Sequence, residues 1–136
     1  MKFYPLLFSL IFFPIACFSE TDDVEGDINC DGNKDSARIA QVNDKVVLTV
    51  VLHDGTIANE LSFGVGDPMR QDALCGMSAH LNSEQMTEDL SVILEQNPEG
   101  YRPSSACIGL NISGGECDSI HIFWNHVTNE LNWWRI

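Results

Sequence analysis

The amino-acid sequence predicts a small α+β protein, predominantly antiparallel β, with six or seven strands arranged in meanders and hairpins. Three observations support this fold class. Short apolar runs, either rich in β-branched residues or alternating with polar residues, recur along the chain. Turn residues such as Asn, Asp and Gly separate these runs. One segment, residues 83–96, has the apolar spacing of an amphipathic helix. A single domain is predicted over residues 27–136.

The chain opens with the pattern of a secretory signal peptide. Lys2 precedes an apolar run over residues 3–18 that contains proline and is shorter than the roughly 20 apolar residues of a membrane span, so no membrane span is predicted. Cleavage is predicted after Ser19, which would deliver the protein to the periplasm or outside the cell. A rival cut would leave Cys17 as a lipidated first residue. Pro14 disfavours it, because lipid-attachment signals usually carry a small or aliphatic residue there.

The first half of the mature chain is predicted to form a meander. After the signal peptide, residues 1–19, a polar and acidic stretch over 20–26 is interpreted as a flexible lead. Three antiparallel strands are then predicted over residues 36–42, 45–52 and 57–65. The separators contain Asn43-Asp44 and Asp54-Gly55, which tolerate the backbone angles of tight turns. The 45–52 run is apolar almost throughout, so it is predicted to be a central strand covered on both faces.

The middle of the chain is predicted to contain one more strand and then the helix. Residues 74–81 alternate between apolar and polar side chains, as a half-buried strand does. Four apolar residues then fall at the spacing i, i+4, i+7 and i+8 of one helical face: Met86, Leu90, Ile93 and Leu94. Asn82 and Ser83 are suitable capping residues, and Asn97-Pro98 would end the helix.

The C-terminal third returns to strand patterns over residues 106–112, 117–124 and 131–136, with a glycine-rich turn between the first two. Without Cys17 four cysteines remain, and an even number suits two disulfides in an oxidising compartment. Three pairings are possible. The glycine-rich turn favours Cys107–Cys117, which leaves Cys30–Cys75.

The chain is strongly acidic, with a formal net charge of −13. A surface of this sign repels nucleic acid and anionic lipid, and it attracts cations and basic proteins. We therefore expect no nucleic-acid partner, and we expect a basic protein as the partner. The alternative is an acidic surface that only keeps an exported protein soluble.

The most specific motif covers residues 27–35, which read D-x-N-x-D-G-x-x-D. Calcium takes about six to eight oxygen ligands, and alternate residues of a tight loop point toward a common centre. The predicted ligands are the side chains of Asp27, Asn29 and Asp31, the backbone carbonyl of Asn33, and Asp35 either directly or through water. An EF-hand would carry glutamate at the twelfth position, where this chain has Arg38. The alternative is a turn rich in Asp and Asn that binds no metal.

This loop resembles the calcium loops of FG-GAP and VCBS repeats, in which D-x-N/D-x-D-G-x-x-D runs straight into a β-strand. Here Ser36-Ala37-Arg38-Ile39, the start of a predicted strand, follows the loop at once. The resemblance covers the loop and the start of that strand, and it implies a structural calcium ion in a β-rich module. Cys30 departs from the repeats, which often carry glycine at that position. Those families stack several such units into a propeller, whereas this chain has room for one.

The C-terminal aromatic segment supplies a second candidate surface. Trp133, Trp134 and Arg135 could contact a sugar ring or a protein partner. Because neighbouring residues of a strand point to opposite faces, one of the two tryptophans is expected to be exposed. The alternative, which we favour, is that Trp124 and one of the pair fill the core while the other covers the end of the barrel. The four histidines lack the spacing of a metal site and are interpreted as ordinary surface or hydrogen-bonded residues.

The sequence contains no nucleophile elbow, no phosphate-binding glycine loop and no Cys–His pair. We therefore predict a non-enzymatic, exported binding module with a structural calcium ion. Inhibitors of lysozyme-like enzymes, or immunity proteins, are examples of this class with a basic partner. A calcium-dependent carbohydrate-binding module is the alternative.

Overall fold

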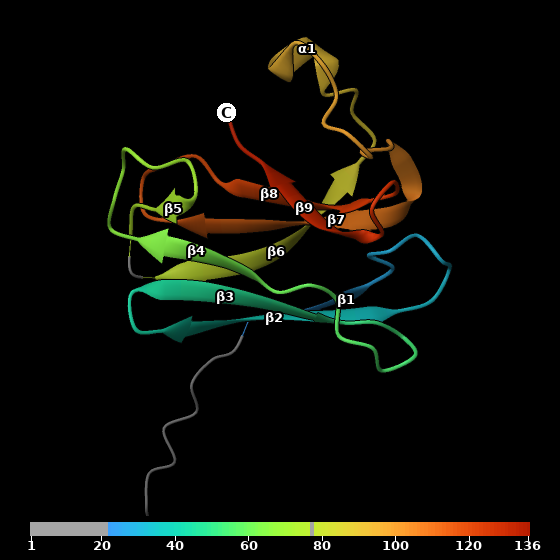
Figure 1. Ribbon diagram of the computed structural model, residues 1–136, viewed down its shortest axis with the longest axis horizontal. Helices are drawn as coiled ribbons and strands as arrows, with labels where there is room; N and C mark the ends of the chain where they lie inside the picture. The colour runs from blue at the N-terminus through green and yellow to red at the C-terminus, as the bar shows by residue number, and fades with distance from the viewer. Residues whose placement is uncertain (1–21, 77) are drawn as a thin grey trace, which may run out of the picture.

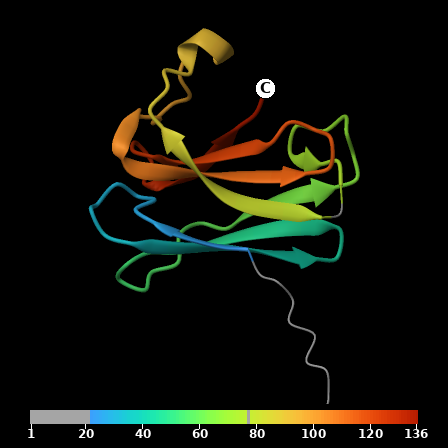
Figure 2. The same ribbon diagram turned by 180° about the vertical axis from the view of Figure 1, so that it is seen from behind.

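The computed structural model describes residues 22–76 and 78–136. The predicted signal peptide and its cleavage site lie outside the described residues. The described part of the chain forms two β-sheets that face each other, with a short helix standing off one of them (Figures 1 and 2). Within that part, no helix is long and apolar enough to span a bilayer.

The first sheet contains five strands in chain order: β1 (Asp23–Gly26), β2 (Asp35–Val42), β3 (Lys45–Val51), β4 (Leu61–Val65) and β5 (Ala73–Leu74). The second contains four: β6 (Ala79–Met86), β7 (Ser104–Gly114), β8 (Ile120–Asn125) and β9 (Glu130–Trp134). Neighbouring strands are antiparallel except β4 and β5, which are parallel. The predicted predominance of antiparallel β structure is confirmed.

The meander of the first sheet follows the predicted pattern closely. Residues 36–42 and 45–52 correspond to β2 and β3, and the later part of 57–65 corresponds to β4. Asn43, in the first turn, has φ 56°, which a tight turn between twisted strands requires. β3 is the central strand of this sheet, as predicted, but the predicted coverage of both faces is wrong, because only alternate residues are fully buried. It therefore faces the core on one side only.

The core lies between the two sheets, where the inward residues of successive strands meet. β3 contributes Val46, Leu48 and Val50, all 1% exposed or less. β8 contributes Ile120 and Ile122 from the opposite sheet, at similar burial. Burial of each such side chain stabilises the fold by about 1.5–3 kcal/mol relative to exposure. Because strand residues alternate between faces, the odd-numbered neighbours in β8 must point away from this core.

The edges of the two sheets are joined on both sides. On one side, the Leu81 N–H of β6 donates to the Asp22 carboxylate at 3.2 Å, and the Ile108 N–H of β7 donates to the Asp27 carbonyl at 2.9 Å. On the other side, Arg135 Nη1 donates to the Ala73 carbonyl at 2.7 Å. The exposed backbone of an edge strand is thereby partly occupied within the molecule.

The predicted helix over 83–96 is wrong in extent. Its first part belongs to β6, whose residues pair with β7 from Ala79↔Gly114 to Gln85↔Ile108, and only Ser91–Leu94 form a helix, α1. An isolated helix of three turns is marginal in water, whereas pairing with an 11-residue strand supplies a long ladder of backbone hydrogen bonds. Of the predicted helical stripe, Met86 and Leu90 are buried but Ile93 is 46% exposed.

Two other boundaries differ from the predictions. Residues 23–26, expected in a flexible acidic lead, form β1 and pair with β2 from Asp23↔Arg38 to Gly26↔Asp35. The strand predicted over 74–81 is divided, because β5 ends at Leu74 and β6 begins at Ala79. A break at this point lets the chain leave the first sheet and enter the second.

The favoured cysteine pairing is also wrong. The disulfides are Cys30–Cys107 and Cys75–Cys117, with Cα–Cα distances of 5.1 and 5.6 Å. Cys107 lies near the start of the long strand β7 and Cys117 lies beyond its end, so the hairpin does not bring them together. Instead, the start of β7 lies beside the 27–35 loop, and its end lies beside the segment after β5, where the Gly76 N–H donates to the Gly114 carbonyl at 3.2 Å.

Candidate functional site

The outer face of the second sheet carries a row of polar and aromatic side chains. The strand register places Asn111 of β7 opposite His121 of β8, and His121 opposite Trp134 of β9. Their neighbours Ile112, Ile120 and Ile122 are buried in the core. By the alternation of a strand, the row therefore lies on the side of the sheet that faces away from the sandwich.

Glu84 of β6 joins this row through a hydrogen-bonded cluster. Its two carboxylate oxygens lie 2.9 and 3.1 Å from His121 Nδ1, and Asn111 Nδ2 donates to the carboxylate at 3.3 Å. The side chains of His121 and Glu84 remain 21% and 27% exposed, so both are sheltered but reachable from solvent. A carboxylate held in this way keeps a fixed orientation.

The His121 ring is stacked on the Trp134 indole. The ring centroids are 4.0 Å apart and the planes differ by 8°. The stack fixes both rings on the sheet surface and leaves Trp134 half-buried. Such an arrangement presents an aromatic surface whose two rings are packed against each other.

The connection between β6 and β7, residues 87–103, stands on the same outer side of the sheet and carries α1 (Figures 1 and 2). Its base is fixed by Asn125, a buried residue at the end of β8. Asn125 Nδ2 donates to the Glu99 carbonyl at 3.0 Å. Gly100 lies against the Asn125 side chain at φ 75°, and a Cβ at that position would collide with the Asn125 amide. The fixed base positions the residue that follows, Tyr101.

Tyr101 forms a wall of the site. Its hydroxyl donates to the Glu88 carbonyl at 3.0 Å, and its ring packs edge-to-face on Phe123 with centroids 5.4 Å apart. Leu90, from the same connection, is buried nearby. The connection and the sheet surface therefore enclose a pocket between them.

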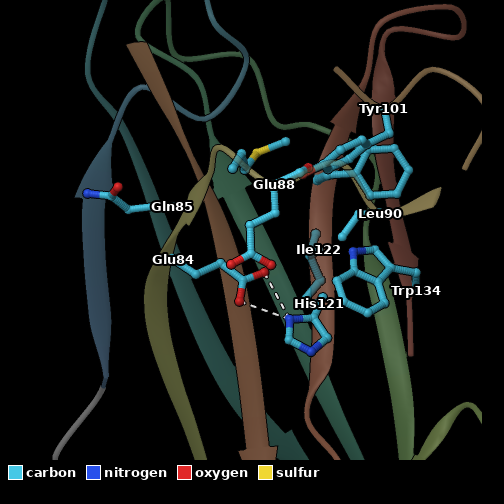
Figure 3. A pocket seen from close by; sticks show the side chains of 10 residues that line it. Glu84, Gln85, Glu88, Leu90, Tyr101, His121, Ile122 and Trp134 are labelled. Carbon is cyan, nitrogen blue, oxygen red and sulfur yellow. Dashed lines mark hydrogen bonds and ion pairs between the residues drawn. The ribbon is translucent and has the colours of Figure 1, made fainter. Parts of the chain in front are cut away.

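This pocket lies on the second sheet, β6–β9, which we call sheet B, and it is named the sheet-B pocket. Its cavity volume is about 170 Å³. Figure 3 shows Glu84 bonded to His121, with Trp134, Tyr101 and Glu88 around the same opening. The lining residues are Glu84, Gln85, Met86, Glu88, Leu90, Tyr101, His121, Ile122, Phe123 and Trp134. Small-molecule sites usually measure about 300–1,000 Å³, so this pocket is matched to a smaller group such as one side chain.

The electrostatic potential inside the sheet-B pocket is negative. Burial raises the pKa of Tyr101 above its ordinary value, and the negative charges of Glu84, Glu88 and Asp89 raise it further. Both effects disfavour the phenolate, the second because like charges repel. A positive group that entered the pocket would be attracted by the same carboxylates.

The predicted calcium loop is folded around its own backbone. The Asp27 carboxylate accepts the N–H groups of Asp31 and Gly32, at 3.1 and 2.8 Å. The Asp31 N–H also donates to Asn29 Oδ1 at 3.1 Å, so the side chains of Asp27 and Asn29 converge on one atom. Asp31 in turn accepts the Asn33 N–H at 2.8 Å. The pKa of Asp31, which is exposed, is lowered, and the largest cause is this hydrogen bond from the Asn33 N–H.

Asp35 occupies a different position from the other predicted ligands. Its side chain is 2% exposed and lies beneath the loop. One carboxylate oxygen accepts the N–H groups of Ile28 and Asn29, at 2.9 and 3.3 Å, and the other accepts the His53 N–H at 2.9 Å. Asp35 therefore ties the loop to the end of β3.

The oxygen atoms of the loop side chains partly fit the ligand requirements of a hard cation. Oxygen side chains at Asp27, Asn29 and Asp31 lie on the same turn, and each carboxylate oxygen has lone pairs beyond those used by one N–H. Asp35 does not join them. Over residues 22–76 and 78–136, no three His, Cys, Asp or Glu side chains are grouped so that they could hold a metal ion.

The C-terminal candidate residues separate into three environments. Trp133 packs on the core, with its ring edge-to-face against Phe63 at 5.8 Å. Trp134 lies on the opposite side and lines the sheet-B pocket. The expectation that the two tryptophans face opposite sides is confirmed. Arg135 binds the carbonyls of Gln71 and Ala73, so its guanidinium has a structural role.

The sequence-based prediction did not include Glu84, His121 or Tyr101 in the site. A signal for His121 existed, because the alternation of Ile120 and Ile122 points the residue between them outward. Glu84 had no such signal, since its segment was assigned to a helix. Tyr101 lies in an irregular connection, where periodicity gives no direction.

Comparisons with protein-family models, with curated proteins and with solved structures find no match for this chain.

Proposed function

We propose that this protein is an exported, non-enzymatic binding module whose partner is a basic protein, and that the outer face of the β6–β9 sheet makes the contact. The observation that carries the proposal is the sheet-B pocket, in which the carboxylates of Glu84 and Glu88 stand beside aromatic rings in an open cavity. A carboxylate next to a flat aromatic surface favours a cationic group. Aromatic anchors in a sheltered pocket are typical of interface hot spots.

The overall charge supports the same class of partner. A net charge of −13 attracts a basic protein over distances of about a Debye length and accelerates association at low salt. The connection over 87–103 adds to this charge close to the pocket, since it carries Glu88, Asp89, Glu95 and Glu99 against the single cation Arg102. The acidic field and the pocket therefore coincide on one side of the molecule.

Export is supported by the cysteines. Both disulfides join segments far apart in sequence, with separations of 77 and 42 residues. Such bonds persist in oxidising compartments and are rare where thiols are kept reduced. A periplasmic or secreted location is therefore proposed, in agreement with the signal peptide predicted at the N-terminus.

A calcium ion in the 27–35 loop is proposed as a structural part of the module. Asp27, Asn29 and Asp31 would hold it through side-chain oxygens, and Asn33 through its carbonyl. Asp35 would position the loop from below and would not ligate. The ion would supply positive charge that offsets the loop carboxylates, and the resemblance to FG-GAP and VCBS loops supports it.

The partner class can be tested with two basic secreted hydrolases, lysozyme and ribonuclease A, immobilised beside an acidic protein of similar size as the control. We expect binding to at least one basic protein, with affinity that falls as salt concentration rises. Retention no stronger than on the acidic control, at low salt, would remove the proposal.

A calcium-dependent carbohydrate-binding module is the second candidate, favoured by the aromatic surface of Trp134 beside polar groups. One face of this indole is already covered by His121, which reduces the area that a sugar ring could contact. A glycan array with and without chelator decides between the candidates. Glycan binding that depends on calcium and is lost in Trp134→Ala would replace the basic partner with a sugar.

A further inference from the structure

We infer that the sheet-B pocket binds one arginine side chain of the basic partner, an assignment that rests on the proposed function. The pocket would hold the guanidinium beside the carboxylates of Glu84 and Glu88, with the aliphatic part of the side chain along the apolar wall. The site is a built cavity with both polar and aromatic walls, and its residues come from β6, β8, β9 and the connection over 87–103.

The size of the cavity limits the ligand. A volume of about 170 Å³ is below the range of small-molecule sites, and the pocket opens to solvent on the outer side of the sheet. A single extended side chain projecting from a partner surface satisfies both conditions. A folded segment or a larger ligand would cover the pocket without entering it.

The charged groups of the pocket determine the sign of the charge that a ligand must carry. Glu84 accepts from His121 and Asn111, but an ionised carboxylate has about four acceptor positions, so positions remain for a ligand. Glu88 lines the same cavity from the connection above the sheet. An anion entering here would be repelled by both carboxylates, whereas a cation could form charge-assisted hydrogen bonds with them.

The aromatic walls favour arginine over lysine. The stacked pair of His121 and Trp134 and the ring of Tyr101 present flat surfaces around the opening. A guanidinium is planar, stacks on aromatic faces and bonds carboxylates in a fixed fork, whereas an ammonium is a strongly hydrated point charge. Met86 and Leu90 are buried nearby and provide apolar surface for the methylene groups.

The direct test is a titration of the purified protein with N-acetyl-arginine methylamide and with the lysine equivalent, followed by the NMR signals of the His121 ring and the Trp134 indole. We expect saturable shifts of both signals with the arginine compound, and affinity about threefold or more weaker with the lysine compound. Equal or tighter binding of the lysine compound would overturn the assignment to arginine. Shifts that spread over the acidic surface without saturating would overturn the pocket itself.

Charge-matched variants test whether the pocket engages the partner. Glu84→Gln and Glu88→Gln each remove one charge from the pocket, and each should weaken binding of the arginine compound and of the basic protein about tenfold. Glu60→Gln removes the same charge from an exposed position outside the pocket lining, and it should change affinity less than about twofold. Unchanged melting of the three variants confirms that the fold is retained.

Failure of the pocket can be distinguished from failure of the proposed function. If the basic protein binds the unmodified chain, and Glu60→Gln weakens it as much as Glu84→Gln does, the proposed function stands and the arginine pocket is wrong. If neither basic protein binds the unmodified chain, the proposed function fails and the pocket assignment fails with it.

Discussion

The 27–35 loop and the sheet-B pocket both concentrate carboxylates, but the two regions use them in opposite ways. In the loop, Asp27 and Asp35 accept hydrogen bonds from backbone N–H groups of the same chain. In the pocket, Glu84 accepts from the side chains of His121 and Asn111, and Glu88 borders an open cavity. The loop carboxylates are bound by backbone groups of their own segment, whereas the pocket carboxylates border an opening that a ligand from outside can enter.

This difference shows that a carboxylate's role depends on the donors around it more than on its sequence motif. The loop has the recognisable pattern, and its hydrogen bonds fix the connection between β1 and β2. The pocket has no local motif, because its residues come from three strands and a connection. Substitutions in the loop should therefore lower stability with little effect on binding, and substitutions in the pocket should do the reverse.

The largest effect is expected from the disulfide that joins the loop to the second sheet. Cys30 lies in the loop and Cys107 in β7, the strand that also carries Asn111. Because this bond closes a long loop, with a sequence separation of 77, the double variant Cys30→Ala/Cys107→Ala should lose about 4–5 kcal/mol of unfolding free energy. Denaturant unfolding measures the loss. Loss of arginine-compound binding by the variant while it remains folded would contradict the separation of the two regions.

The fold class and the meander of the first sheet were predictable from the sequence, and the pairing of the second sheet was not. β2 and β3 are local in sequence, so their turn and their apolar pattern fix the register between them. β6 and β7 are separated by the 87–103 connection, so no turn fixes their register. The apolar spacing of residues 86–94 also matched a helix, but residues 83–86 pair with β7 and only Ser91–Leu94 form a helix.

Only those site residues whose direction follows from strand alternation were predictable. Trp134 was included, because adjacent tryptophans in a strand must face opposite sides. Glu84 could not be included, because its segment was assigned to a helix and the β6–β7 register was therefore unknown. The cysteine pairing failed for a different reason, because β7 is long enough to keep Cys107, near its start, away from Cys117, beyond its end.

The second largest effect should come from Asp35 in the loop. Asp35→Ala leaves three N–H donors, at Ile28, Asn29 and His53, without their acceptor in a site that is 2% exposed. We expect a loss of about 3 kcal/mol in the free energy of unfolding, measured by chemical denaturation.

Two further variants serve as controls for Asp35→Ala. Asp118→Ala removes an exposed carboxylate and should change the free energy of unfolding by less than about 0.5 kcal/mol. Glu84→Gln, in the pocket, should change it by less than about 1 kcal/mol. A larger loss of stability in Glu84→Gln than in Asp35→Ala would reverse the comparison between the regions.

Calcium should sharpen the comparison further, because it is proposed for the loop alone. At calcium concentrations about 100-fold above the dissociation constant, the ion should add about 2.7 kcal/mol to the free energy of unfolding. Scanning calorimetry with calcium and with chelator measures the difference. Asp27→Ala and Asp31→Ala should abolish it, whereas Glu88→Gln should leave it intact. Identical melting with calcium and with chelator in the unmodified protein would refute the metal site.

The smallest effect concerns the pocket and the ionisation of Tyr101. Burial, and then the charges of Glu84, Glu88 and Asp89, raise the pKa of this tyrosine above its ordinary value. A raised pKa contributes stability that is fully present below about pH 10 and is lost as pH rises through the folded-state pKa. Tyr4 lies in the predicted signal peptide, so Tyr101 is the only tyrosine of the chain cleaved after Ser19, and the absorbance of tyrosinate reports it alone. Glu88→Gln should lower its pKa because one like charge is removed, and Asp31→Ala, in the loop, should not. If both variants lower the pKa equally, the field at the pocket belongs to the whole acidic surface, and the two regions do not differ in the way their carboxylates act.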